Sequence, residues 1–414
     1  MSSTKQEPAA VSQSPVVMAI SATTIVQVLS SLIALGVPVL APAIAADLGM
    51  DPELIGYYPG ILYSAALAIC IIGDPLLSLV RPMLRSLVCV LISIVGLALL
   101  LGASLPFFIL GALMIGLGYG PIVPSTSQIL SARTPGRHAN LIFSLKQSGA
   151  PLGGILAGII VPFLVGYAGG WTGAIEVVAV GGVLVLLALS PLTPRLDKGV
   201  TPLRSAGMLA PIKAVLAVPS LRQLVIMSSS YGGMQLCLGA FLTVYLVHVL
   251  NLDFGLAGLV FGVSQAAGMI GRLVWGYVAD RFFTPKTLMA FLGFAMAASA
   301  FLVAAFSAEW PFWAILVVSA AYGGTAMGWN GVLLAEVARI APPGETGRVT
   351  SGVMSANYAG VIVGPLLFTA IAYVMGTQRA GFILIGIITA LSACTSFRVR
   401  TSRDEAEIQG SAKF

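Results

Sequence analysis

The stretch RHANLIFSLKQSG, residues 137–149, has a partial repeat in RVTSGVMSANYAG, residues 348–360. An arginine, a serine and a glycine recur at matching offsets: Arg137 and Arg348, Ser144 and Ser355, Gly149 and Gly360. Lys146 falls opposite Asn357, so the repeat is broken at a charged residue. Chance matching between apolar helices of low complexity is the alternative. The repeat predicts two related halves of the same orientation, as in transporters built from parallel repeats.

The composition predicts that lipid is the solvent of this chain. Of 414 residues, 58% are hydrophobic and 9% are charged, with 47 glycines, whereas soluble domains carry about 25% charged residues. Small residues let helices pack closely in lipid. The cysteines are scattered through apolar segments, which argues against a metal site: Cys70, Cys89, Cys237 and Cys394. We expect no cofactor and no metal.

Twelve apolar runs approach the length of about 20 residues that a membrane-crossing helix needs. They lie at 16–45, 54–79, 84–104, 106–132, 140–167, 171–190, 219–249, 255–280, 286–306, 310–338, 349–374 and 378–397. We therefore expect an all-α membrane protein with twelve transmembrane helices in two pseudo-symmetric six-helix bundles. The expected parts are a tail at 1–15, a bundle at 16–190, a linker at 191–218, a bundle at 219–397 and a tail at 398–414.

The loop charges predict the orientation. Basic residues occupy one set of connections: Arg81, Arg85, Arg133, Arg137, Arg195, Lys198, Arg204, Lys213, Arg281, Lys286, Arg339 and Arg348, with Arg398, Arg400 and Arg403 after the last run. The alternate connections carry Asp47, Asp51, Glu53, Asp253 and Glu309, and only Arg379 is basic. Since basic loops stay in the cytoplasm, both termini and the linker are expected there, in a cell (inner) membrane. The net charge of +6 is explained by these loops and does not indicate nucleic acid.

The stretch GRLVWGYVADRFFTPK, residues 271–286, resembles the cytoplasmic motif of the major facilitator superfamily, and the resemblance covers essentially the whole chain. It implies a gating cluster at the cytoplasmic side, for which we select Gly276, Asp280, Arg281, Glu336 and Arg348. Asp280 is expected to bond a neighbouring arginine or a helix N-terminus. Glu336 either joins it or is an ordinary interfacial charge.

The counterpart of this motif in the first half, GDPLLSLVRPMLRS at 73–86, is degenerate. The position four residues after Gly73 is Leu77, where the motif would have an acid. Asp74 lies near but offset, and the usual gating role is not assigned to it.

Two cations lie deep in the predicted spans. Lys146 is nine residues past Arg137 and Arg272 eight before Asp280, which places them roughly 13 and 12 Å along their helices. Ionisable groups inside a span cost a few kcal/mol and by default indicate a functional site. An anion bound between the two cations would remove their mutual repulsion. It would therefore favour closure of the protein around itself.

The resemblance implies that spans 5 and 8 meet between the halves, where these cations would face each other. Arg272 is also similar to the span-8 arginine of monocarboxylate and oxalate/formate transporters, which contacts a substrate carboxylate. A second cation of oxalate antiporters lies in span 11, where this chain has Asn357. Other interpretations are that Lys146 snorkels or pairs with Glu176, and that Arg272 braces backbone carbonyls. Further pocket candidates are Tyr119, Tyr231, Gln235, Gln265, Trp329, Asn330, Asn357 and Tyr358.

These observations predict a secondary active transporter that moves a small organic anion, expected to be a carboxylate, by alternating access. A membrane potential opposes anion uptake by about 2.3 kcal/mol per charge per 100 mV, so uptake needs a co-transported proton or a counter-anion. The alternative is a drug or metabolite efflux transporter of the same superfamily. The motifs of a membrane enzyme are not found, and we expect a monomer.

Overall fold

The computed structural model describes residues 13–49, 57–134, 138–200, 204–307 and 309–397, and these residues contain helices and no strand. Ten helical segments in this described part are long and apolar enough to cross a membrane. The shorter apolar helices α3 (Tyr58–Ile72) and α19 (Gln378–Cys394) supply two more. The all-α, twelve-helix prediction is confirmed. Arg137, most of both tails, and the acidic pair at 51 and 53 lie outside the described residues.

The first half runs from α1 to α11. Its helices are α1 (Gln13–Leu48), α3, α4 (Asp74–Leu77), α5 (Pro82–Leu99), η1 (Leu100–Gly102), α6 (Leu105–Tyr119), α7 (Ile122–Ser131), α8 (Ala139–Gln147), α9 (Gly149–Tyr167), α10 (Trp171–Leu189), η3 (Ser190–Leu192) and α11 (Thr193–Asp197).

The second half follows the linker helix α12 (Ala210–Ala217). Its helices are α13 (Pro219–His248), α14 (Phe254–Arg281), α15 (Pro285–Ala304), α16 (Phe312–Ala326), α17 (Trp329–Ile340), α18 (Thr346–Met375), α19 and η4 (Thr395–Phe397).

Spans 4, 5 and 10 are each divided into two helices. Span 4 consists of α6 and α7 and breaks at Gly120 and Pro121, where proline lacks the amide that would continue the ladder. Span 5 breaks at Ser148, between α8 and α9, and span 10 breaks between α16 and α17. Each break leaves a separate short helix, and these helices contribute Val123 (α7), Gln147 (α8) and Asn330 (α17) to the cavity described below.

Each half has its own hydrophobic core. One core is built from α1 to α11 and the other from residues of α12 to α19. The first core also includes Leu334, Ala335, Met354 and Tyr358, which come from α17 and α18. The two halves are therefore joined by apolar packing around α17 and α18.

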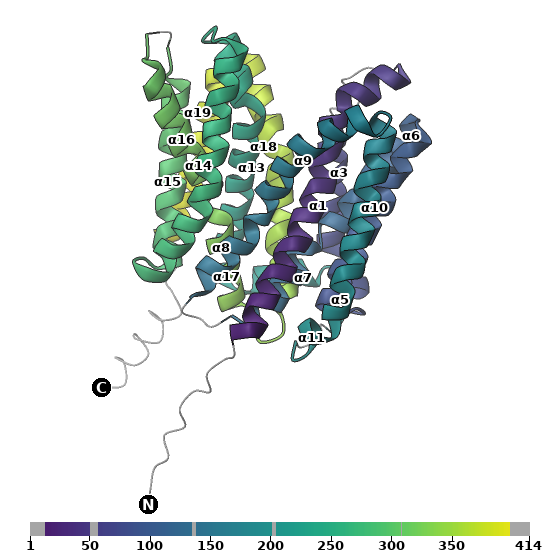
Figure 1. Cartoon of the computed structure of the whole chain (residues 1–414). Helices are drawn as coiled ribbons and strands as arrows, with labels where there is room; N and C mark the ends of the chain where they lie inside the picture. Colours follow the sequence, from purple (N-terminus) through teal and green to yellow (C-terminus); the bar gives the residue numbers. More distant parts are fainter. Residues whose placement is uncertain (1–12, 50–56, 135–137, 201–203, 308, 398–414) are drawn as a thin grey trace, which may run out of the picture.

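The halves contact each other mainly at one end of the molecule. Figure 1 shows α11, α17 and the beginning of α1 at the same end, which we call the linker end. There α3, α7 and α8 of the first half pack against α14, α17 and α18 of the second. Away from this end, α9 packs against α1 and α10, and α16 packs against α14 and α15, all within their own halves. The halves are closed together at the linker end.

Candidate functional site

A cavity of about 310 Å³ lies between the halves. Both halves contribute to its lining: Gln27, Ser31, Leu35, Tyr63, Tyr119, Val123, Gln147, Ala150 and Pro151 from the first, and Gly232, Gln235, Leu236, Gly239, Phe261, Gln265, Arg272, Met327, Asn330, Met354, Asn357, Tyr358 and Val361 from the second. Seven of the ten residues proposed from sequence for the pocket line it: Tyr119, Gln235, Gln265, Arg272, Asn330, Asn357 and Tyr358. Among these described lining residues Arg272 is the one charged side chain, and none is Asp or Glu.

Arg272 is held at the wall of this cavity by span 5. Its Nη1 donates a hydrogen bond of 2.6 Å to the backbone carbonyl of Gln147. The side chain is 3% exposed, and its Nε has no hydrogen-bond partner within the described structure. A bond of the kind named in the alternative interpretation, a brace to a backbone carbonyl, is therefore present. One bond leaves donors of the guanidinium fork available, and such a fork suits bidentate carboxylate binding.

Lys146 does not line the cavity. It is fully buried at the end of α8, where its Nζ donates to Gln27 Oε1 at 3.0 Å and to Gln147 Oε1 at 2.9 Å. Both carboxamides line the cavity, so they separate the ammonium from the space in which an anion would sit. The structure corrects the expectation that Lys146 and Arg272 face each other across an open pathway, because Gln147 lies between them and bonds both.

The alternative in which Lys146 pairs with Glu176 also differs from the structure. Glu176 is exposed in the first turns of α10, and the bonds of Lys146 go to neutral amides. Neutral oxygens satisfy the ammonium without cancelling its charge. A cation at the last turn of a helix is further stabilised by the helix dipole.

Three tyrosines form a cluster on another wall of the cavity. The ring centroids of Tyr63 and Tyr358 are 5.9 Å apart with an interplanar angle of 29°. Tyr119 lies 6.3 Å from each of them, edge-on to Tyr63 and tilted against Tyr358. Tyr63 and Tyr119 belong to the first half and Tyr358 to the second. The cluster therefore spans the boundary between the halves.

Amide side chains connect helices around the second half of the cavity. Asn330 Nδ2 donates to Gln235 Oε1 at 3.0 Å, which joins α17 to α13. Asn357 Nδ2 donates to the Ser228 carbonyl at 3.0 Å, which joins α18 to α13. Asn357 thus acts partly as the helix contact that is common for amides within membrane spans.

Besides Lys146, two residues of the proposed pocket lie elsewhere. Tyr231 and Trp329 are buried in the core of the second half, with ring centroids 5.6 Å apart in an edge-on arrangement. The Tyr231 hydroxyl donates to the Met289 carbonyl at 2.9 Å, and Trp329 Nε1 donates to the Ala326 carbonyl at 2.8 Å. Their polar atoms are satisfied inside the bundle, so these side chains pack and do not line the cavity.

The lining residues that sequence reasoning missed include Gln27, Tyr63 and Gln147. A glutamine within an apolar span was a signal for Gln27, and the position beside Lys146 was a signal for Gln147. Tyr63 carried no such signal, because an isolated tyrosine in a span is equally consistent with packing.

At the linker end, Asp280 holds the beginning of α8. Its Oδ1 accepts from the Asn140 amide and side chain at 3.1 and 2.8 Å, and its Oδ2 accepts from the Leu141 amide at 2.9 Å. The carboxylate thus satisfies free N–H groups in the first turn of a helix from the other half, as expected for an acid at a helix N-terminus.

The helix backbones of the two halves also approach each other closely beside the Asp280 contact. A Cβ at Gly331 would lie 2.3 Å from Ser144 Cα, and one at Gly276 would lie 2.6 Å from Ser144 Oγ. Glu336, expected near this cluster, forms an ion pair with Arg339 at 2.6 Å and lines a small cavity that Asn140 also lines. Arg281 is exposed.

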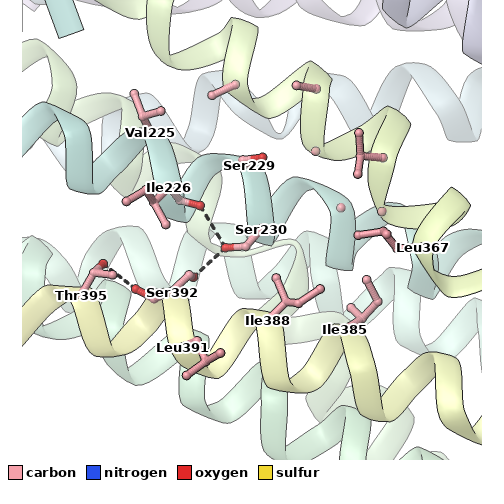
Figure 2. A pocket seen from close by; sticks show the side chains of 16 residues that line it. Val225, Ile226, Ser229, Ser230, Leu367, Ile385, Ile388, Leu391, Ser392 and Thr395 are labelled. Atoms are coloured by element: carbon pink, nitrogen blue, oxygen red, sulfur yellow. Dashed lines mark hydrogen bonds between the residues drawn. The ribbon is translucent and has the colours of Figure 1, made fainter. Parts of the chain in front are cut away.

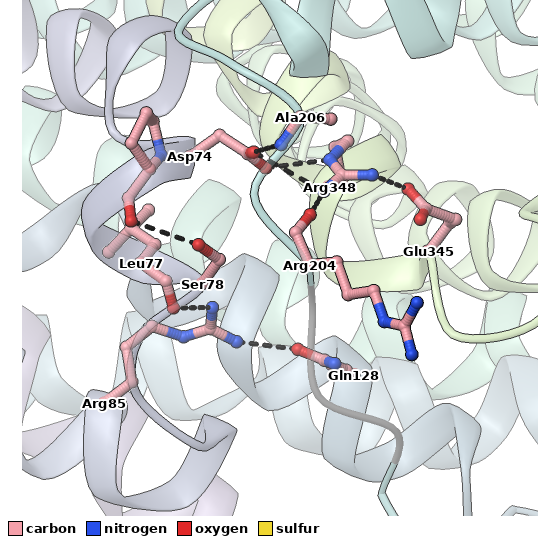
Figure 3. Close-up of polar contacts among 10 residues, drawn as sticks. Asp74, Leu77, Ser78, Arg85, Gln128, Arg204, Ala206, Glu345 and Arg348 are labelled. Carbon is pink, nitrogen blue, oxygen red and sulfur yellow. Dashed lines mark hydrogen bonds and ion pairs between the residues drawn. The ribbon is translucent and has the colours of Figure 1, made fainter.

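Asp74 has a larger role than the sequence indicated. It is buried and forms an ion pair with Arg348, whose Nε lies 2.8 Å from Asp74 Oδ1. Asp74 Oδ2 also accepts from the Ala206 amide at 3.0 Å, and Arg348 donates to the Arg204 carbonyl and pairs with Glu345. Figure 3 shows these contacts around the linker backbone. Helix α3 ends at Ile72 and α4 begins at Asp74, so the acid that pairs with Arg348 directly follows this break and does not occupy the position four residues after Gly73.

Arg85 is likewise part of the interior and not a loop charge. It is 4% exposed and donates to the Leu77 carbonyl at 2.7 Å, to Ser125 Oγ at 2.8 Å and to Gln128 Oε1 at 2.6 Å. These bonds hold α4 against α5 and α7, beside the Asp74 contact (Figure 3).

A second cavity, of about 720 Å³, lies among α13, α18 and α19. Its lining is mainly aliphatic, with a hydroxyl pair in which Ser230 Oγ donates to Ser392 Oγ at 2.6 Å (Figure 2). Several of its lining side chains, such as Leu391, are strongly exposed on the outside of the bundle. This cavity suits acyl chains or apolar compounds, and it has no charged lining residue in the described chain to attract an ion.

Comparison with known proteins places these features in a family. A sequence model described as Major Facilitator Superfamily matches residues 23–338. The human organic anion transporter MFSD10 (TETRAN) superposes with a TM-score of 0.73 at 16% identity, covering 92% of this chain and 99% of that one. The E. coli fucose:proton symporter FucP gives 0.67 at 15% identity, covering 91% and 99%.

The proton:xylose symporter XylE, solved with 6-bromo-6-deoxy-D-glucose, gives a TM-score of 0.68 at 16% identity, covering 92% of this chain and 95% of that one. At these identities the structures establish a shared fold and nothing about substrate. No curated protein matches the sequence.

Proposed function

The chain belongs to the major facilitator superfamily, and on that premise we propose that it is a secondary active transporter of a small organic anion whose carboxylate binds Arg272. That it is an integral membrane transporter and not an enzyme follows from the family. The anion, the coupling and the orientation are our proposal.

One observation carries the proposal. The cavity between the halves contains a buried guanidinium with an unpartnered Nε and, among the described lining residues, no carboxylate. An ionisable group inside the membrane is costly by a few kcal/mol and marks a substrate or ion pathway when it faces a cavity. A ligand carboxylate would supply the missing counter-charge. Lys146 adds positive potential from behind Gln27 and Gln147.

We propose that the linker end faces the cytoplasm of a cell (inner) membrane. Basic residues gather there: Arg133, Arg195, Lys198, Arg204, Lys213, Arg281, Lys286, Arg339 and Arg348. Cytoplasmic loops of membrane proteins are enriched in Lys and Arg. Because the halves are joined at this end, the conformation corresponds to one in which the cavity is shielded from the cytoplasm.

The transport cycle follows from this arrangement. The anion enters from the side opposite the linker and removes the electrostatic cost of an unpaired Arg272. The contacts of Asp74 and Asp280 then separate as the halves rock, and the anion leaves toward the cytoplasm, accompanied by a proton or exchanged for a counter-anion. A ligand shifts such an equilibrium only by its differential affinity for the two states. One chain carries both halves, so we propose the monomer as the transporting unit.

Uptake of radiolabelled carboxylates into proteoliposomes tests the proposal, using wild type, Arg272→Ala and Arg272→Lys. We expect uptake by wild type, none above background with Arg272→Ala, and partial uptake with Arg272→Lys, because lysine keeps the charge and loses the planar fork. Equal uptake by wild type and Arg272→Ala would disprove the assignment of the carboxylate to Arg272.

Efflux of an apolar drug or metabolite is the second candidate. The aliphatic cavity of about 720 Å³ among α13, α18 and α19 favours it. In the same proteoliposomes, extrusion of a neutral apolar dye that is insensitive to Arg272→Ala would support this candidate and not the first.

A further inference from the structure

The cavity between the halves has chemically different walls. Gln27 on α1, Gln147 on α8 and Arg272 on α14 make the first, and α8 packs against both α1 and α14. Tyr63 on α3, Tyr119 on α6 and Tyr358 on α18 make the second, and α3 packs against both α6 and α18. A ligand that fits both walls has an anionic end and a flat apolar end.

The three rings are arranged as a recognition surface for a flat group. Tyr63 and Tyr358 lie nearly parallel, and Tyr119 presents a different angle to each. Aromatic partners prefer offset-stacked or edge-on contacts with centroids about 4.5–7 Å apart. A planar ligand ring that enters beside the cluster can therefore make stacked or edge-on contacts without displacing it. A saturated ring of similar size lacks the π face and the quadrupole that favour these contacts.

One hydroxyl of the cluster is unused. Tyr358 is 2% exposed, lines the cavity, and its hydroxyl oxygen has no hydrogen-bond partner within the described structure. Buried tyrosine hydroxyls usually find a partner. Removal of this hydroxyl would therefore break no hydrogen bond within the described structure.

Two observations limit the ligand's size. The volume of about 310 Å³ lies at the lower limit of small-molecule sites, about 300–1,000 Å³. Tyr119 and Arg272 line this same cavity, so the aromatic wall and the guanidinium share one small space. The anionic group and the flat group of the ligand must therefore be joined by a short link.

We infer that the transported anion is a compact aryl carboxylate, with its carboxylate on Arg272 and its ring against Tyr63, Tyr119 and Tyr358. This inference rests on the proposed function and specifies its substrate class. A long acyl chain would extend beyond this volume, and small aliphatic acids leave the tyrosine wall without contact.

Calorimetric titration of the full chain in nanodiscs tests the inference with benzoate, cyclohexanecarboxylate and acetate. The measured quantity is the ratio of the benzoate affinity to the cyclohexanecarboxylate affinity. This ratio does not change when part of the protein in a sample is inactive. Wild type is expected to bind benzoate roughly three- to tenfold more tightly than cyclohexanecarboxylate, the range of an aromatic contact, and acetate more weakly than either. Tyr63→Leu and Tyr358→Leu should each bring the ratio toward one.

Matched variants separate recognition from folding. Tyr358→Phe keeps the ring and should keep the ratio, while Tyr373→Leu removes an 88% exposed tyrosine at the outside of α18 and should change nothing. If both ring acids bind wild type equally well and both need Arg272, the aryl preference is wrong and the anion proposal stands. If no carboxylate binds, both fail.

Discussion

Asp74 and Arg348, 274 residues apart in the chain, form an ion pair with 2.8 Å between Oδ1 and Nε that joins the two halves at the linker end. The contact of Asp280 with the first turn of α8 is its counterpart. Asp74, at the end of span 2, holds the beginning of span 11. Asp280, at the end of span 8, holds the beginning of span 5. In both cases the span that is held belongs to the other half. The first half thus has an acid that makes the corresponding contact despite its degenerate motif.

Asp74→Asn should loosen the linker end. Charge-assisted hydrogen bonds contribute about 1.5–3 kcal/mol, so we expect the open population to rise about tenfold or more. The reporter is Ser144→Cys in a Cys394→Ser background, because Ser144 is fully buried against Gly276 and Gly331 and its hydroxyl has no partner in the described structure. The rate of modification by a polar maleimide is measured.

Glu176→Gln is the matched control, since it neutralises an exposed acid on α10. It should leave the modification rate of the reporter unchanged. An unchanged rate in Asp74→Asn as well would mean that the ion pair does not hold the halves together.

Gly331→Ala should destabilise the same packing. The added Cβ would lie 2.1–2.5 Å from Ser144 atoms, two of them backbone, and overpacking of this kind costs about 1–3 kcal/mol. Gly262→Ala on α14 is the control, because its Cβ meets nothing within 4 Å. Thermal unfolding in detergent should show a lower midpoint for Gly331→Ala alone; similar midpoints for both would contradict the close helix contact.

Much of the fold could be predicted from hydropathy and loop charge, because each membrane span needs a long apolar segment and leaves its ends at a polar interface. Asp74 shows where this approach fails. Its importance depends on a helix break at Gly73 and on the linker backbone at Ala206, and neither contact is visible in local sequence.

The candidate site was predicted in part. A polar residue in an apolar span marks its position along the helix and not the direction of its side chain. Arg272 and Lys146 gave the same signal, yet Arg272 lines the cavity and Lys146 lies behind two carboxamides. The same holds for four aromatic residues within spans. Tyr119 and Tyr358 line the cavity, whereas Tyr231 and Trp329 are buried in the core of the second half.

The two cations should contribute unequally to anion binding. Arg272→Ala removes the contact itself, and loss of roughly a hundredfold in affinity is expected for a buried hydrogen-bonded charge pair. Lys146→Met removes only a charge behind Gln147, and we expect roughly a tenfold loss from the weakened potential. Titration with benzoate measures both.

Lys213→Met, which removes an exposed lysine of α12, should bind benzoate like wild type. A larger loss for Lys146→Met than for Arg272→Ala would reverse the assignment and make Lys146 the primary anion ligand.

Exchange of anions should be faster than net uptake. After the anion leaves, the empty transporter must return with Arg272 buried, and no acid among the described lining residues can neutralise it. Burial of an unpaired charge in the membrane costs a few kcal/mol, whereas return with a second anion avoids this cost. Preloading proteoliposomes with unlabelled benzoate should therefore accelerate labelled uptake by about tenfold or more. Uptake into empty liposomes that equals exchange and follows an imposed proton gradient would instead establish proton symport.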